Sequence, residues 1–178
     1  SGKTFLAVAQ ALFLVLTRKK NKLIITRPVV EAGENLGFLP GDLEQKLNPY
    51  LRPLRDSMES VLPIETVKHL FEAGIIEVAP LAYMRGRTLN NAVIILDEAQ
   101  NTTIAQMKMF LTRMGESSKV FITGDQTQVD LPKKQTSGLI HALNVLYKID
   151  DIGFMELTTD DVVRNHLVKK IVKAYENE

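Results

Sequence analysis

Three short groups of residues in this chain carry the side chains that phosphate and magnesium chemistry needs. The first is Gly2-Lys3-Thr4, which is followed at once by an apolar, helix-forming run. In the pattern G-x-x-x-x-G-K-[ST], the lysine neutralises the β- and γ-phosphates, the hydroxyl binds Mg²⁺, and N–H groups at the helix start cradle phosphate. Only the last three positions of this pattern are present, so we expect Gly2, Lys3 and Thr4 to be the second half of such a loop.

The second group is Asp97-Glu98, which directly follows the apolar run 92–96. An aspartate at such a strand end can hold Mg²⁺, directly or through a water molecule. The glutamate beside it can orient or deprotonate an attacking water. Taken alone, a solvated acidic turn explains the pair equally well, because acidic residues are common in turns.

The third group is Gly124, Asp125 and Gln128, which follow the apolar run 119–123. A glycine lets the backbone approach a phosphate closely. Gln128 could donate a hydrogen bond to a γ-phosphate or hold the attacking water. Taken alone, a plain Gly-Asp turn is the better interpretation of this group.

The elements that must position these groups can be predicted from the hydrophobic pattern. Four nearly continuous apolar runs, at 22–26, 75–79, 92–96 and 119–123, are typical of strands buried on both faces of a parallel sheet, and 153–157 is a weaker fifth. Helical patterns lie between them. They cover 4–17, 42–62 with a break near Pro49 and Pro53, 65–73, 104–114, 137–146, and part of 162–175.

This alternation predicts an α/β fold with a mostly parallel sheet covered by helices on both faces. Such a fold binds its ligand at the carboxyl ends of the strands. The three groups of residues all fall at that edge, and their conjunction favours a nucleotide site over three unrelated turns. The strand that should precede Gly2 is expected to be missing from the chain.

Composition narrows the class of protein. The chain has 178 residues, enough for one domain with a core, and we expect 1–178 to form a single domain. Its 22 Lys and Arg nearly balance 21 Asp and Glu, so net charge does not argue for a polyanionic partner. There is no Cys, which excludes disulfides and fits a cytoplasmic protein, and no apolar run approaches the length of a membrane span.

Longer motifs resemble one known family. The segments TRPVVEAGENLGFLPGDL (26–43), AYMRGRTL (82–89), ILDEAQNTT (95–103), QMKMFLTR (106–113) and TGDQTQVDLP (123–132) look like the PhoH family of bacterial, phosphate-starvation-associated P-loop ATPases, and DVVR (161–164) resembles its C-terminal signature. The resemblance covers almost the whole chain. It implies a RecA-like ATPase core, close to that of helicases, whose first (Walker A) strand lies outside this sequence.

The resemblance also implies roles for single residues. Gly2-Lys3-Thr4 matches the end of Walker A, Asp97-Glu98 matches Walker B, and Gly124, Asp125 and Gln128 match a helicase-like sensor. Arg164 matches a late arginine of the family, although Asn165 stands where the family usually has His. The expected ligands are ATP and Mg²⁺, with Thr4 and Asp97 at the metal.

Four arginines and a tyrosine could serve either catalysis or nucleic-acid binding. An arginine is expected to stabilise the transition-state charge on the γ-phosphate. Arg164 is the first candidate, against a salt bridge to Asp160 or Asp161, and Arg87 is the second. Arginines for phosphate and an aromatic for stacking suit single-stranded nucleic acid. Tyr83, Arg85 and Arg87 fit that description as well as they fit a structural or interface loop, and Arg27 is either a phosphate contact or a surface arginine.

These observations predict a cytoplasmic, Mg²⁺-dependent ATPase in which Glu98, Gln128 and Arg164 act in catalysis. A single domain of this size would complete its site by self-assembly, so we expect a homo-oligomeric ring, of which a hexamer is one form. ATP turnover is expected to be coupled to RNA binding or remodelling. The alternative is an ATP-binding assembly or regulatory partner of an RNA-processing protein such as a nuclease, without motor activity.

Overall fold

Four parallel strands form the sheet of this protein, which is described here from a computed structural model. The strands are β1 (Lys22–Arg27), β2 (Ile76–Pro80), β3 (Ala92–Leu96) and β4 (Lys119–Ile122), in the spatial order β2-β1-β3-β4. The structure describes the chain apart from residues 1, 30–42, 159–160, 162, 164 and 176–178, and the side chains of 43–47 and 49–50. The expected parallel α/β fold is confirmed.

Side chains alternate between the two faces of the sheet, as the period of a strand requires. Leu23 and Ile25 of β1 face one hydrophobic cluster, whereas Ile24 between them faces the other. Every residue of β3 is buried. A strand covered on both faces has no solvent side, which is why its sequence is hydrophobic without interruption.

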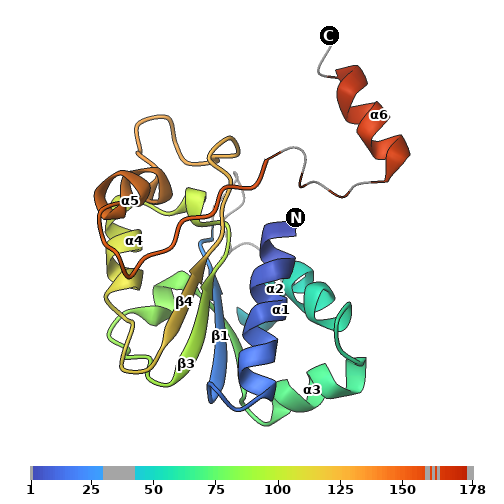
Figure 1. Cartoon of the computed structure of the whole chain (residues 1–178), viewed down its shortest axis with the longest axis vertical. Coiled ribbons are helices and arrows are strands. Elements are labelled where there is room, and N and C mark those ends of the chain that lie inside the picture. The colour runs from blue at the N-terminus through green and yellow to red at the C-terminus, as the bar shows by residue number, and fades with distance from the viewer. Residues whose placement is uncertain (1, 30–42, 159–160, 162, 164, 176–178) are drawn as a thin grey trace.

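Helices cover both faces (Figure 1). On the first face lie α1 (Gly2–Leu16), α2 (Leu43–Glu59) and α3 (Ile64–Glu72), whose buried side chains join one cluster. On the second lie the short 3₁₀ helix η2 (Leu81–Met84), α4 (Ile104–Leu111) and α5 (Gly138–Leu146). A second 3₁₀ helix, η3 (Ala99–Asn101), follows β3, and α6 (His166–Tyr175) comes last among the described elements. Within the described residues, no helix combines the length and the hydrophobicity needed to cross a bilayer.

Two expectations about the elements were wrong. Residues 153–157 form no strand in the described sheet, because Phe154 and Met155 are 47% and 87% exposed and have no core face to bury. The helix expected over 42–62 does not break at its prolines, since α2 runs through Pro49 and Pro53. Burial of Leu54 and Met58 in the first cluster stabilises the helix and offsets the cost of the backbone hydrogen bonds that proline cannot form.

The direction of the chain changes between β1 and β3, and this change determines where a ligand can bind. From β1 the chain passes through α2 and α3 to reach β2 on one side of the sheet. From β3 it passes through α4 to reach β4 on the other side. Parallel α/β sheets bind ligands outside the carboxyl ends of their strands at such a switch point. The carboxyl ends of β1, β3 and β4 are therefore the place to look for a site.

Candidate active site

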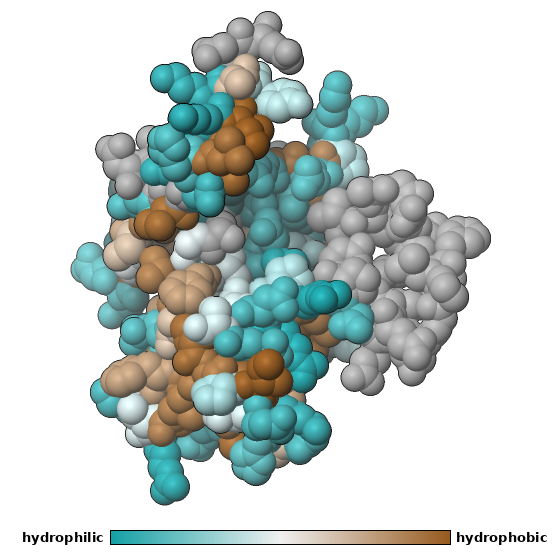
Figure 2. Space-filling model, turned by 90° about the vertical axis from the view of Figure 1, so that its right-hand side faces the viewer, coloured by the Kyte–Doolittle hydropathy of each residue, from teal (hydrophilic) through white to brown (hydrophobic). Residues whose placement is uncertain are grey.

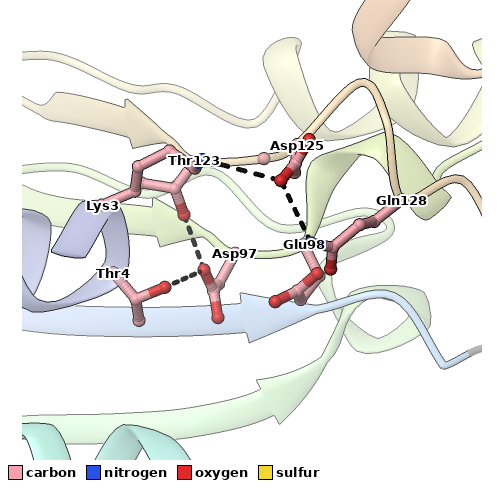
Figure 3. A pocket seen from close by; sticks show the side chains of 8 residues that line it. Lys3, Thr4, Asp97, Glu98, Thr123, Asp125 and Gln128 are labelled. Atoms are coloured by element: carbon pink, nitrogen blue, oxygen red, sulfur yellow. Dashed lines mark hydrogen bonds and ion pairs between the residues drawn. The ribbon is translucent and has the colours of Figure 1, made fainter. Parts of the chain in front are cut away.

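An open pocket lies at the carboxyl ends of β3 and β4, beside the N-terminus of α1. Its walls are formed by Lys3, Thr4, Asp97, Glu98, Thr123, Gly124, Asp125 and Gln128. Figure 3 shows that the labelled side chains converge from three places: the first turn of α1, the end of β3 and the loop after β4. The three groups of residues that the sequence singled out are thus brought together in one pocket.

The end of β3 is held in place by backbone hydrogen bonds to both neighbouring strands. The Asp97 N–H donates to the Thr26 carbonyl of β1 at 2.9 Å. On the other side, the Thr123 N–H donates to the Leu96 carbonyl and the Ala99 N–H donates to the Thr123 carbonyl, each at 2.9 Å. These bonds continue the ladder past the last strand residues, so the backbone that carries Asp97 is rigidly placed.

The side chain of Asp97 is the centre of the site. The Thr4 hydroxyl donates to Asp97 Oδ1 at 2.8 Å, and the Thr123 hydroxyl donates to the same oxygen at 2.6 Å. Arg27 donates to Oδ2 through Nη2 at 2.6 Å and through Nε at 3.2 Å. The carboxylate is only 2% exposed, and these charge-assisted bonds compensate for its removal from water.

Glu98 has an unusual backbone conformation beside this centre. Its φ of 55° and ψ of 37° lie in the left-handed region, which few residues other than glycine adopt. Such a conformation costs about 1–3 kcal/mol and persists only where the surroundings enforce it. The Glu98 side chain is 41% exposed, so its carboxylate is open to the pocket and to water.

Gln100 connects Glu98 to the loop after β4, and the sequence analysis missed it. Its side-chain amide donates to Glu98 Oε2 at 2.6 Å and more weakly to the Gln128 carbonyl at 3.4 Å, while its Oε1 accepts from the Asp125 N–H at 3.0 Å. The residue is 1% exposed. Gln100 lies two positions after Glu98, so the strand-end argument that found Asp97 and Glu98 could have been extended to it.

Close packing at Gly124 depends on the same glutamine. A Cβ atom at this position would lie 2.5 Å from Leu139 Cδ2 and 2.9 Å from Gln100 Oε1, both closer than normal contact. The glycine was expected to allow close approach of a phosphate, and in the structure it allows close approach of these two side chains.

Lys3 and Asp125 face each other across the pocket. Lys3 Nζ lies 3.9 Å from Asp125 Oδ2, a loose ion pair between side chains that are about one third exposed. The Thr127 hydroxyl and N–H both donate to Asp125 Oδ1, and these bonds, with a smaller contribution from Lys3, lower the pKa of Asp125. Gln128 donates to the other oxygen at 3.2 Å, so the loop is ordered around this aspartate.

The proposed magnesium ligands have suitable chemistry. Mg²⁺ prefers oxygen ligands, keeps several waters, and is bound in phosphate sites through one or two carboxylates plus the phosphates. Thr4 Oγ1 and Asp97 supply one hydroxyl and one carboxylate at hydrogen-bonding distance from each other. Among the described residues, no group of three or more His, Cys, Asp or Glu side chains could hold a metal ion.

The arginines and Tyr83 are distributed over different places. Arg27 lies at Asp97, with its side chain 17% exposed, and is not a free surface residue. Arg87 makes a two-bond ion pair with Glu77 of β2, at 2.6 and 3.0 Å, and is not among the residues that line the pocket. Tyr83 is 50% exposed and Arg85 is exposed. Arg164 lies outside the described residues, so its predicted role stays a prediction.

The fold and the pocket together define a class: a parallel α/β core of the P-loop NTPase type, with the lysine and threonine of α1 facing the Asp-Glu pair of β3. The chain matches the family described as "PhoH-like protein" over residues 1–176 and belongs to the PhoH family, a family of nucleotide-binding P-loop ATPases.

Relatives in three bacteria agree with this assignment. A PhoH-like protein of Mycobacterium tuberculosis (strain H37Rv) is 59% identical over 175 residues, which are 98% of this chain and 50% of the relative. One of Bacillus subtilis is 58% identical over 178 residues, which are 100% and 56%. Protein PhoH of Escherichia coli K12 is 46% identical over 176 residues, which are 98% and 50%. The chain therefore spans about half the length of these relatives.

Proposed function

We propose that the protein binds ATP and hydrolyses it in a Mg²⁺-dependent reaction to ADP and phosphate. The observation that carries the proposal is the 2.8 Å hydrogen bond between Thr4 Oγ1 and Asp97 Oδ1, two residues that are 93 positions apart in the sequence. It joins the end of a phosphate-binding loop to the acidic end of a strand, which is the pair of groups that P-loop enzymes use to hold the metal.

Five polar side chains of the pocket would act in this reaction. Lys3 would exchange its loose contact with Asp125 for the β- and γ-phosphate oxygens, while Thr4 and Asp97 would hold Mg²⁺. When bound, Mg²⁺ neutralises charge that develops on the phosphates. The exposed Glu98 carboxylate would accept a hydrogen bond, and then the proton, from the attacking water. Gln128, at the rim, would hold that water or the γ-phosphate.

The direct test is ATP hydrolysis by the protein at the full length of its relatives, with Lys3→Ala and Glu98→Gln variants. We expect Lys3→Ala to lose nucleotide binding, and Glu98→Gln to retain binding while its turnover falls about 10²-fold or more. Lys68→Ala, which removes an exposed lysine of α3, is the matched control and should behave as the wild type. A wild type that neither binds nor hydrolyses ATP would refute the proposal.

Coupling to RNA is a second part of the proposal, supported by the position of η2. This helix follows β2, so Tyr83 and the neighbouring Arg85 come after the carboxyl end of a strand, as the pocket residues do, and both are exposed. If single-stranded RNA binds there, Arg85→Glu should abolish stimulation of turnover by RNA and leave basal turnover unchanged. Arg52→Glu, an equal change of charge on exposed α2 surface, is the control.

The alternative is an ATP-binding partner of an RNA-processing protein. It would be favoured if RNA does not change turnover and if Glu98→Gln leaves biological activity intact. A cytoplasmic location remains part of the proposal. So does assembly into a homo-oligomeric ring, because a site on a single domain of this size would be completed by residues of a neighbouring copy.

A further inference from the structure

Arg27 lies beside Asp97 and balances the negative charge that a metal ion bound there would otherwise neutralise. Its guanidinium is bound to Asp97 Oδ2 through two nitrogens, at 2.6 and 3.2 Å. The other oxygen, Oδ1, accepts from the hydroxyls of Thr4 and Thr123. Both oxygens of this buried carboxylate are therefore engaged, and its charge is balanced by Arg27.

Lys3, a positively charged side chain that lines the pocket, does not help to balance the charge of Asp97. Lys3 Nζ pairs with Asp125 at 3.9 Å. Among the described residues, Arg27 is the one basic residue that forms an ion pair with Asp97. Arg27 Nη2 also lies 3.9 Å from Glu98 Oε1, so a second carboxylate is within reach of a small movement. The Asp97 backbone is held by the 2.9 Å hydrogen bond from its N–H to the Thr26 carbonyl, so only the Arg27 side chain would turn in such a movement.

We propose that Arg27 is a built-in counter-cation for Asp97 that keeps a free divalent cation out of the site until the cation arrives with the nucleotide. A divalent ion and a guanidinium on one carboxylate repel each other strongly in a partly buried site. The phosphates of a nucleotide supply the extra negative charge that lets both cations stay, with Arg27 turning toward Glu98 or the γ-phosphate. This inference rests on the proposed function and deepens it.

The same arrangement would make Arg27 a positioning residue for Asp97 and Glu98. Leaving a buried carboxylate without a partner is costly, and its neighbours rearrange to compensate. By holding the Asp97 side chain in one orientation before the metal arrives, Arg27 would keep the carboxylate ready for the cation. A purely structural ion pair would stay closed when the nucleotide and Mg²⁺ bind, and this difference can be measured.

The first experiment measures binding of Mn²⁺ alone, without nucleotide, by electron paramagnetic resonance on the full-length protein. Arg27→Gln should bind Mn²⁺ about tenfold or more tightly than the wild type, since removing a charge near a cation site changes affinity on that scale. Arg27→Lys, which keeps a charge, should stay close to the wild type. The gain should vanish in Arg27→Gln combined with Asp97→Asn. Equal or weaker Mn²⁺ binding by folded Arg27→Gln would overturn the proposal.

A second measurement uses the wild type and so does not depend on whether Arg27→Gln folds. The Arg27 Nε–H resonance, assigned by its loss in Arg27→Lys, is followed by ¹⁵N NMR. It should shift when a non-hydrolysable ATP analogue is added with Mg²⁺, and change much less with the analogue and a chelator. A resonance unchanged by the Mg²⁺ complex would overturn the inference. Failure of the analogue to bind at all would instead refute the proposed function, while the Mn²⁺ result would still stand.

Discussion

Asp97 receives hydrogen bonds from residues that come from three separate parts of the chain: the first turn of α1, the end of β1 and the end of β4. Each of these donors could change its partner when phosphates and a cation bind, since hydroxyls rotate and the Arg27 side chain is long. Asp97 is therefore both a structural link between three elements and the proposed metal ligand. Substitutions here test folding and binding together, so neighbours are better probes of catalysis.

Gln100 is such a neighbour. Gln100→Leu keeps the approximate volume but removes the donor to Glu98 Oε2 and leaves the Asp125 N–H without its acceptor. Leaving a buried donor unpaired costs about 1–3 kcal/mol of stability. We expect turnover to fall at least tenfold with nucleotide affinity nearly unchanged, because Glu98 would lose its orientation.

The measurement for Gln100 is kcat and nucleotide Kd, together with unfolding by urea. Gln106→Leu, which affects only the exposed cap of α4, is the control for loss of a glutamine. If Gln100→Leu has normal kcat, Gln100 is only a packing residue and the link from Glu98 to the loop after β4 has no catalytic role.

Among the elements, the edge strand β2 is tied to the segment that follows η2. Glu77 of β2 accepts two hydrogen bonds from Arg87 and lies 2.8 Å from Lys22 of β1. The hydrogen bonds from Arg87 are the main reason that the pKa of Glu77 falls from 4.5 to about 2, with Lys22 adding to the effect and burial opposing it. Arg87, which the sequence offered as a catalytic, nucleic-acid or structural residue, thus has a structural partner in Glu77, and its other predicted roles stay predictions.

The lowered pKa predicts how stability depends on pH. Unfolded chains bind the Glu77 proton near pH 4.5 and the folded protein only near pH 2. The ion pair therefore stabilises the fold fully above about pH 4.5, and this contribution is lost as the pH falls toward about 2. Because Glu77 is 28% exposed, we expect about 1 kcal/mol.

The check is urea unfolding of the wild type and of Glu77→Gln across that pH range. The wild type should lose about 1 kcal/mol more than Glu77→Gln on acidification, since other carboxylates titrate in both proteins. Glu65→Gln, on the exposed start of α3, should retain the wild-type dependence. Identical pH dependence in the wild type and Glu77→Gln would show that the ion pair does not stabilise the fold.

Among the described elements, α6 is the one least attached to the rest of the molecule. None of its residues is buried, and it stands away from the sheet in Figure 1. Leu167, Val168, Ile171 and Tyr175 share one side of the helix and are between 43% and 74% exposed. Apolar surface on α6 is visible beside polar surface at the top of Figure 2. A helix of this kind gains stability mainly when its apolar side packs on something.

Self-assembly, if it uses this side of α6, should be sensitive to Ile171→Ser. We expect this variant to weaken association of the full-length protein about tenfold, measured by sedimentation, because burial of a large aliphatic side chain contributes about 1.5–3 kcal/mol. Its melting temperature as a monomer should not change. Lys169→Ser, on the other side of the helix, is the control. An oligomer unaffected by Ile171→Ser would show that α6 is not part of the interface.

The sequence by itself determined the class of fold and most of the pocket. Strands buried on both faces are hydrophobic throughout, so β1 to β4 could be found from local pattern alone. Because parallel strands end at one edge, Lys3, Thr4, Asp97, Glu98 and Gln128 could be assigned to one site from their positions after the predicted strands and at the start of a helix. These inferences need only local periodicity and the direction of the chain.

Only the tertiary structure decided which polar groups pair with one another. Arg27 binds Asp97 over a separation of 70 residues, and Arg87 binds Glu77, although both arginines look alike in the sequence. Gln100 and Thr123 acquire their roles from groups that follow another strand, the Asp125 N–H after β4 and the Asp97 carboxylate after β3. Residues 153–157 have a strand-like pattern but pair with no strand in the part of the chain that the structure describes. Pairing depends on distances between segments far apart in the chain, and local pattern does not contain those distances.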